Sequence, residues 1–200
     1  MLLHSLLALT PLALASAIPQ ATAPNTEIPS FGERFGIAAD GPGIINTDLR
    51  AQAGRLYIGG PQTPTCEDNA RQDFATFVQY SDKTLYLFKY GNPPQQIWVD
   101  ASGMGQGITG FSNVDGNSTA PRNASFAEFE IDEETGDLTF EGTGAKACPT
   151  TEEGRWSVWF TTSETPGWQE GCVDVTLRAY SAPARVAYMI CPNEKPKQGL

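Results

Sequence analysis

Short runs in which apolar and polar side chains alternate constrain this chain more than any other feature of its sequence. Such alternation places the apolar side chains of an extended strand on one face. Gly, Pro, Asn and Asp separate the runs, as they do where strands are joined by turns. We predict about eleven to thirteen strands and no amphipathic helix, with only residues 67–75 suited to a helical turn. The clearest runs cover residues 55–58, 85–88, 97–99, 127–132 and 173–178.

The fold class that follows is all-β, with antiparallel strands in a single domain over residues 35–191. Residues 133–137 form the clearest hairpin connection, because Gly136 can adopt the positive φ that such a loop needs. A β-sandwich and a β-trefoil-like barrel both fit the number of strands. We narrowly favour the trefoil-like barrel, since strand–turn–strand units recur at loose intervals without helices between them.

The first 17 residues have the organisation of a secretory signal peptide. A Leu/Ala-rich segment leads to Ala-Ser-Ala at residues 15–17, a small-residue cleavage pattern, although the start carries no Lys or Arg. Cleavage there would remove His4, the one histidine of the chain. The secreted product would then lack Ser-His-Asp and Cys-His catalysis and His-ligated zinc. We expect residues 18–34 to be a flexible Pro/Thr-rich leader and residues 192–200 a disordered tail.

Four cysteines remain after this cleavage: Cys66, Cys148, Cys172 and Cys191. An even number in an exported protein predicts two disulfides, and the lack of a Cys-x-x-Cys pair argues against zinc. The chain-entropy gains of the three possible pairings differ by only about 1 kcal/mol. Loop lengths therefore leave all three pairings open.

Two N-glycosylation sequons begin at Asn117 and Asn123, within a stretch rich in Gly, Asn, Ser and Pro at residues 112–124. This composition is typical of an exposed loop. We therefore expect a glycoprotein that carries carbohydrate at these asparagines.

The formal net charge of −10, with no Lys/Arg cluster, disfavours nucleic acid and anionic membranes as partners. No second apolar stretch is long enough to anchor the chain in a bilayer. Residues 103–107, Gly-Met-Gly-Gln-Gly, have the wrong spacing for a dinucleotide-binding loop, and no helix is predicted after them. We expect a turn there, and no cofactor.

Glycosidases need only two carboxylates, so a protein without histidine could still hydrolyse sugars. The densest acidic cluster consists of Glu128, Glu130, Asp132, Glu133 and Glu134. Alternation places the first three on the polar side of a strand and the last two in its turn. This pattern favours a solvated hairpin face over a catalytic pair, and we expect no enzymatic activity.

Four aromatic residues, Tyr86, Phe88, Trp98 and Trp159, stand next to aliphatic residues in predicted strands, so their side chains point to the opposite face of the strand from those neighbours. If the aliphatic side chains face the core, these aromatics face outward and could stack on sugar rings. If both faces of the strands are covered, they are buried instead. The alternation does not decide between these two arrangements.

Residues 136–149 (GDLTFEGTGAKACP) resemble a segment of the phialide cell-wall protein (PhiA-like) family of small secreted fungal proteins. In that family a Leu-x-Phe-x-Gly strand also leads to Ala-Cys-Pro. Other strands of the family are similar, in the same order, to residues 35–37, 54–58, 95–99 and 171–180. Cys66 departs from the family pattern, in which Pro follows the first cysteine and a second cysteine lies close behind.

The resemblance implies the disulfide Cys148–Cys172, which leaves Cys66 to pair with Cys191. It also implies a non-enzymatic glycoprotein of the fungal cell wall with a structural or adhesive role, linked to conidia-bearing cells. It supplies no catalytic, cofactor-binding or metal-binding residue, and wall polysaccharide or wall proteins are the expected partners. The alternative is a secreted effector or lectin-like module that binds glycan through outward-facing aromatics.

Overall fold

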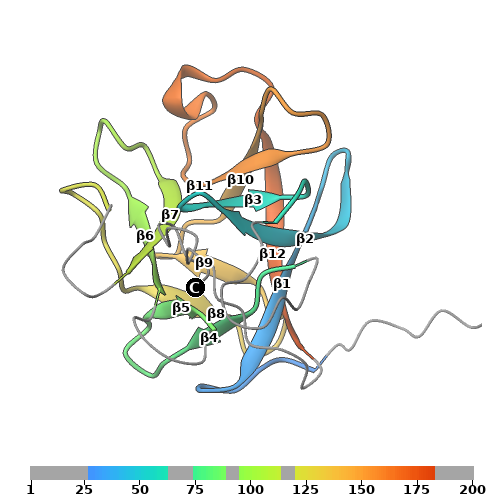
Figure 1. Ribbon diagram of the computed structural model, residues 1–200, viewed down its shortest axis with the longest axis vertical. Helices are drawn as coiled ribbons and strands as arrows, with labels where there is room; N and C mark the ends of the chain where they lie inside the picture. The colour runs from blue at the N-terminus through green and yellow to red at the C-terminus, as the bar shows by residue number, and fades with distance from the viewer. Residues whose placement is uncertain (1–26, 63–73, 89–94, 114–119, 183–200) are drawn as a thin grey trace, which may run out of the picture.

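The computed structural model describes residues 27–62, 74–88, 95–113 and 120–182 (Figure 1). Within these ranges the chain forms twelve β-strands and one short 3-10 helix, as the all-β prediction requires. In chain order the elements are β1 (Arg34–Gly41), β2 (Ile44–Gln52), β3 (Arg55–Ile58), β4 (Phe77–Gln79), β5 (Leu85–Leu87), β6 (Gln95–Asp100), β7 (Ile108–Asn113), β8 (Phe129–Ile131), β9 (Leu138–Phe140), β10 (Ala145–Pro149), β11 (Trp156–Phe160), η1 (Pro166–Trp168) and β12 (Val173–Ser181).

Nine of these strands close into an antiparallel barrel. The ring of pairings runs β1–β4–β5–β6–β7–β3–β11–β10–β12 and returns to β1. Strand β2 pairs with both β1 and β3, and β8 and β9 form a separate two-stranded sheet. A closed ring leaves no free sheet edge and distinguishes a barrel from a sandwich. The barrel prediction is therefore confirmed, whereas its trefoil-like detail stays a prediction.

Three hairpins meet where β3, β7 and β11 pair with one another. The contact between β3 and β7 joins Arg55 to Gly110. Glycine is needed at position 110, because a Cβ there would lie 2.5 Å from the carbonyl oxygen of Gly54 and 2.5 Å from the ring of Trp98. The Arg55 guanidinium in turn lies 5.0 Å from the centre of that ring. The close approach of the strands thus covers Trp98.

Phenylalanine side chains form the centre of the core. The rings of Phe129 on β8 and Phe140 on β9 are 5.1 Å apart, and Phe160 on β11 lies 6.0 Å from each. Phe35 and Phe77 meet at 6.0 Å between β1 and β4. Burying one such side chain contributes about 1.5–3 kcal/mol. The β8–β9 hairpin lies outside the ring of strands and is attached to it by its two buried phenylalanines.

The hairpin predicted at residues 133–137 connects β8 to β9. The N–H of Gly136 donates to the carbonyl oxygen of Asp132 (2.9 Å), and the N–H of Asp132 donates to that of Asp137 (3.0 Å). Gly136 has the expected positive φ, 77°. The N–H of Ala179 on β12 donates to the carbonyl oxygen of Gly136 (2.8 Å), so the loop is also bound to the barrel.

Several sequence predictions concern residues outside the described ranges. These are the signal peptide at 1–17, the leader as far as residue 26, residues 67–73 and the tail at 192–200. The described end of the predicted leader is bound to the barrel, because the N–H of Ser181 donates to the carbonyl oxygen of Glu27 (2.9 Å).

Replacing Phe129 by Ala should lower the free energy of unfolding by about 3–5 kcal/mol, because loss of the ring leaves a cavity beside Phe140 and Phe160. Urea denaturation followed by tryptophan fluorescence measures this loss. Phe31→Ala is the matched control, since Phe31 is 60% exposed and its removal should cost less than about 1 kcal/mol. Equal losses for the two variants would contradict the core position of Phe129.

Candidate functional site

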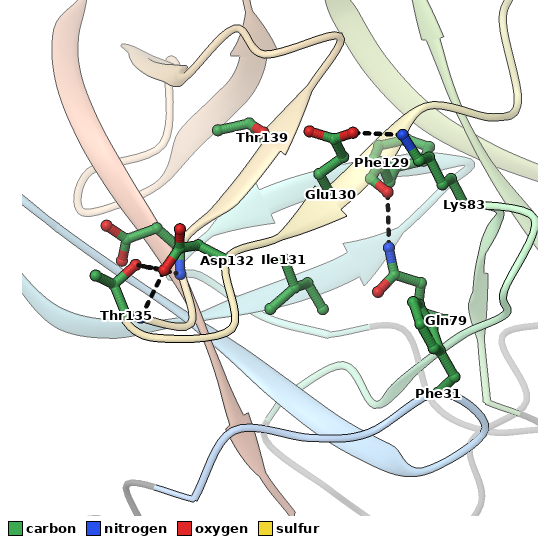
Figure 2. A pocket seen from close by; sticks show the side chains of 10 residues that line it. Phe31, Gln79, Lys83, Phe129, Glu130, Ile131, Asp132, Thr135 and Thr139 are labelled. Atoms are coloured by element: carbon green, nitrogen blue, oxygen red, sulfur yellow. Dashed lines mark hydrogen bonds and ion pairs between the residues drawn. The ribbon is translucent and has the colours of Figure 1, made fainter.

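A groove of about 570 Å³ lies between the β8–β9 hairpin, the β4–β5 hairpin and the segment before β1 (Figure 2). It is open to solvent and combines aromatic, aliphatic, amide, hydroxyl and charged groups. Three segments distant in sequence supply them, so only the folded barrel brings them together. The side chains that define its chemistry are Phe31, Gln79, Lys83, Glu130, Ile131 and Thr139.

Phe31 stands at the groove on a tight turn. The N–H of Glu33 donates to the carbonyl oxygen of Ser30 (3.1 Å), and the Glu33 carboxylate accepts from the N–H of Ser30 (2.9 Å). Gly32 has a φ of 80°, the value that the third residue of a type II turn requires. Its N–H donates to the carbonyl oxygen of Gln79 on β4 (2.9 Å). The turn is thereby fixed to the barrel and holds the Phe31 ring in an exposed position.

Gln79 contributes a buried acceptor to the groove. The side chain is 5% exposed, and its Nε2 donates to the carbonyl oxygen of Phe129 (2.7 Å). Figure 2 shows the amide nitrogen directed at Phe129 and the amide oxygen turned away from it. Within the described part of the chain, neither this oxygen nor the hydroxyl of Thr139 makes a hydrogen bond. Both can therefore bind a polar group that enters the groove.

Ion pairs involve most of the charged side chains that line the groove. Lys83 forms ion pairs with Glu130 and, at 3.7 Å, with Glu128. The bond to the Glu130 carboxylate, with a smaller contribution from Glu128, raises the pKa of the Lys83 amine. Asp137 accepts from Nε of Arg178 (3.1 Å). Asp132 also lines the groove and has no cationic partner among the described residues, so the groove disfavours an anionic ligand.

Asp132 stabilises the turn of the β8–β9 hairpin. Its Oδ1 accepts from the N–H of Thr135 (2.7 Å), the hydroxyl of Thr135 (2.9 Å) and the N–H of Glu134 (3.0 Å). These bonds, the backbone N–H of Thr135 foremost, lower the pKa of the Asp132 carboxyl. All five residues of the predicted acidic cluster are exposed on this hairpin. The interpretation as a solvated hairpin face is confirmed.

The outward orientation considered for four aromatics is wrong for both tryptophans. Trp98 is 2% exposed beneath Arg55, and Trp159 is 5% exposed. Tyr86 and Phe88 are half-buried. The barrel covers both faces of these strands. Alternation distinguishes the two faces of a strand but does not show whether the second face is buried. The exposed aromatic side chains of the described residues are instead Phe31, Tyr80 and Trp168.

The structure contains the disulfide Cys148–Cys172, as the family resemblance implied, with the Cα atoms 4.1 Å apart. It joins the end of β10 to the chain just before β12. Cys66 and Cys191 lie outside the described residues, and so does the sequon at Asn117. Asn123 is exposed, in a turn where the N–H of Ala124 donates to the carbonyl oxygen of Pro121 (3.0 Å).

Residues 103–107 form a turn, as predicted. The N–H of Gly107 donates to the carbonyl oxygen of Asp100 (2.8 Å), and strand β7 follows where a phosphate-binding loop would lead into a helix. No cluster of three metal-ligating side chains occurs among the described residues. Over the same residues, no helix is long and apolar enough to cross a membrane.

The groove could not be predicted from the sequence, because its residues come from the leader and from two hairpins that are distant in the chain. A weak signal did exist: Ser-Phe-Gly at residues 30–32 combines two turn-forming residues with an aromatic. Its position after a Pro/Thr-rich stretch led to its assignment to the leader. Nothing in the local sequence links Phe31 to Gln79 or Thr139.

The closed antiparallel barrel and its disulfide define a class, the small disulfide-bonded β-proteins that function outside the reducing cytosol. Within this class the chain belongs to the PhiA-like secreted protein family, whose sequence model matches residues 35–192. The resemblance noted from short motifs is therefore confirmed over most of the chain. Membership, together with the relatives, establishes a secreted protein that is associated with the cell wall.

Three relatives illustrate the similarity. The cell wall protein phiA of Emericella nidulans is 37% identical over 171 residues, which cover 83% of this chain and 88% of that protein. The protein of the same name from Aspergillus niger is 34% identical over 170 residues, 83% and 86% of the two chains. That of Arthroderma benhamiae is 32% identical over 153 residues, 72% and 80%. No solved structure shows significant similarity to the chain.

A carbon-13 NMR titration of the Asp132 carboxyl should give a midpoint below about 3.9, the ordinary value for Asp. The unfolded chain then binds this proton more readily than the folded one. The contribution of Asp132 to stability is present above about pH 4 and is lost as the pH falls through the lower, folded pKa. Thr135→Val removes one donor and should raise the midpoint. A wild-type midpoint at or above the ordinary value would contradict the turn geometry.

Proposed function

We propose that the protein is a non-enzymatic, adhesive component of the fungal cell wall that holds neutral wall polysaccharide in the groove. The observation that carries this proposal is the exposed Phe31 ring beside the unpartnered oxygen of the buried Gln79. A pyranose ring offers an apolar C–H face and several hydroxyls. The C–H face can stack on an aromatic ring, and the hydroxyls can form hydrogen bonds with amide and hydroxyl groups.

The geometry supports recognition of a neutral sugar in particular. Lys83 is paired with Glu130 and Glu128, so the groove lining offers no free cation to an anionic ligand, whereas a neutral sugar needs none. Ile131 adds an aliphatic surface, and Thr139 adds a hydroxyl that can donate or accept. The turn at residues 30–33 holds Phe31 in place before a ligand arrives, which reduces the entropy lost on binding.

A non-enzymatic role fits the electrostatics of the hairpin. A glycosidase requires a general acid whose pKa is raised, so that it holds a proton near neutral pH. Asp132 has its pKa lowered instead. Glu128 and Glu130 are both paired with Lys83, and the carboxylates of Glu128, Glu130 and Asp132 are all exposed to solvent.

We further propose that the mature protein begins after a signal peptide and carries N-linked carbohydrate. The exposed turn at Asn123 supports attachment there, since a glycan needs unobstructed solvent around its asparagine. The resemblance to the family supports a role in the wall of conidia-bearing cells, which is part of this proposal. A secreted effector with lectin-like binding is the second candidate, and the same groove would serve it.

Calorimetric titration with hexamers of β-1,3-glucan and of N-acetylglucosamine tests the groove. At least one hexamer should bind, and Phe31→Ala should weaken its affinity about tenfold, or 1.4 kcal/mol. Tyr80→Ala is the matched control, because Tyr80 is an exposed aromatic that packs on Tyr86 and does not line the groove. No binding by the wild type, or equal losses in both variants, would refute the proposal.

Fractionation separates the two candidate roles. A structural or adhesive protein should remain in washed walls, and Phe31→Ala should move it into the medium. Free release of the wild type together with saturable hexamer binding would favour the effector.

Incubation with wall glucans, chitin and plant polysaccharides should release no reducing ends above a Glu130→Gln control. Sustained release by the wild type, lost in this variant, would make the protein a glycosidase.

A further inference from the structure

Trp168 is the most exposed large aromatic side chain of the described residues, with 75% of its surface in solvent. It lies in the loop at residues 161–172, between β11 and β12. This loop is at the upper end of the barrel in Figure 1, whereas the segment that carries Phe31 is at the lower end. A ligand that covers this ring would gain the free energy of burying its apolar surface. The loop is not part of the groove.

The backbone at Trp168 is held in an unfavourable conformation. Its φ is 58°, in a region that residues with a Cβ rarely adopt. Hydrogen bonds fix it there: the N–H of Trp168 donates to the carbonyl oxygen of Thr165 (3.0 Å), and that of Gln169 to Pro166 (3.2 Å). Strained residues of this kind cluster at binding sites, where the surrounding structure over-determines them.

Two further contacts hold the loop against the barrel. An added Cβ at Gly167 would lie 2.8 Å from the ring of Trp159, so glycine lets the loop pack directly on that side chain. At the far end of the loop, Cys172 is bonded to Cys148 on β10. The Trp168 ring is therefore presented by a fixed loop and is not a side chain on a mobile tip.

A second exposed apolar side chain lies on the neighbouring turn. Gln106, in the β6–β7 connection, accepts through Oε1 from the N–H of Gly167 (2.8 Å), which joins the two segments. Met104 in that connection is 81% exposed. Trp168 and Met104 are thus exposed apolar side chains on two loops that are joined by a hydrogen bond.

The charges on these loops are all negative. Residues 161–172 contain Glu164 and Glu170, and residues 101–107 contain no charged side chain. The buried Lys146 is committed to Asp174 (2.6 Å) and Glu164 (3.8 Å). Glu170 is exposed and makes no hydrogen bond or ion pair within the described part of the chain. An anionic ligand is repelled here, and a cationic one is attracted.

We infer that Trp168 and Glu170 form a second binding site, which takes a polysaccharide of free amino sugars such as a glucosamine polymer. The aromatic face binds the apolar face of the sugar and attracts its ammonium group, and the free carboxylate of Glu170 pairs with that group. A neutral glycan could use the first contact alone. This inference does not rest on sugar binding in the groove.

Calorimetry and tryptophan quenching at about pH 5.5 and low salt test the site with the glucosamine hexamer and its fully N-acetylated counterpart. The amine of the sugar is protonated at this pH. The glucosamine hexamer should bind at least about tenfold more tightly, and added salt should weaken it. Trp168→Ala should abolish most of this affinity, and Trp168→Phe should retain part of it.

Glu170→Gln should reduce the preference for the free amine and the dependence on salt, and Phe31→Ala should leave the affinity for the glucosamine hexamer and its dependence on salt unchanged. Urea denaturation checks that each variant folds, which the exposure of both side chains leads us to expect. Equal affinity of the wild type for both hexamers would overturn the amino-sugar assignment. Undiminished binding by folded Trp168→Ala would overturn the site itself.

Discussion

The pairing of β1 with β12 is the contact on which the rest of the structure depends. It joins the first and last described strands through six pairs of residues and closes the ring. Gly36 permits it, since a Cβ there would lie 2.3 Å from the ring of Tyr180. The Tyr180 hydroxyl donates to Asp48 on β2 (2.7 Å), and burial, together with this bond, raises the pKa of that phenol. The β1–β12 pairing and the hydrogen bond from Tyr180 to Asp48 thus connect both ends of the described chain to β2.

Closure also decides which side chains remain available for binding. In an open sheet the second face of β6 would be free, whereas here the meeting of three hairpins buries Trp98. The β8–β9 hairpin is excluded from the ring and attached by phenylalanines. Its outer edge then forms one wall of the groove, where Glu130 pairs with Lys83 of the β4–β5 hairpin and Asp132 stabilises the β8–β9 turn.

Turns carry the two exposed aromatic side chains to which we assign binding, Phe31 and Trp168. Phe31 follows Ser30 in a turn bound to β4, and Trp168 stands on a loop fixed by a disulfide. Loops positioned by a rigid scaffold commonly supply binding residues, because they leave the core packing unaffected. The two proposed surfaces lie at opposite ends of one barrel. A protein that holds two polysaccharide chains in this way would strengthen a wall without any reactive group.

The sequence by itself determined the strands, the β8–β9 hairpin and the family, because alternation, turn residues and short motifs are local. Even the disulfide Cys148–Cys172 came from the family pattern, since loop entropy did not choose among the pairings. Only the tertiary structure decided that Trp98 is buried, that Trp168 is exposed and that Phe31 lies beside Gln79. Burial depends on which distant segments cover a face, and period-two alternation carries no information about that.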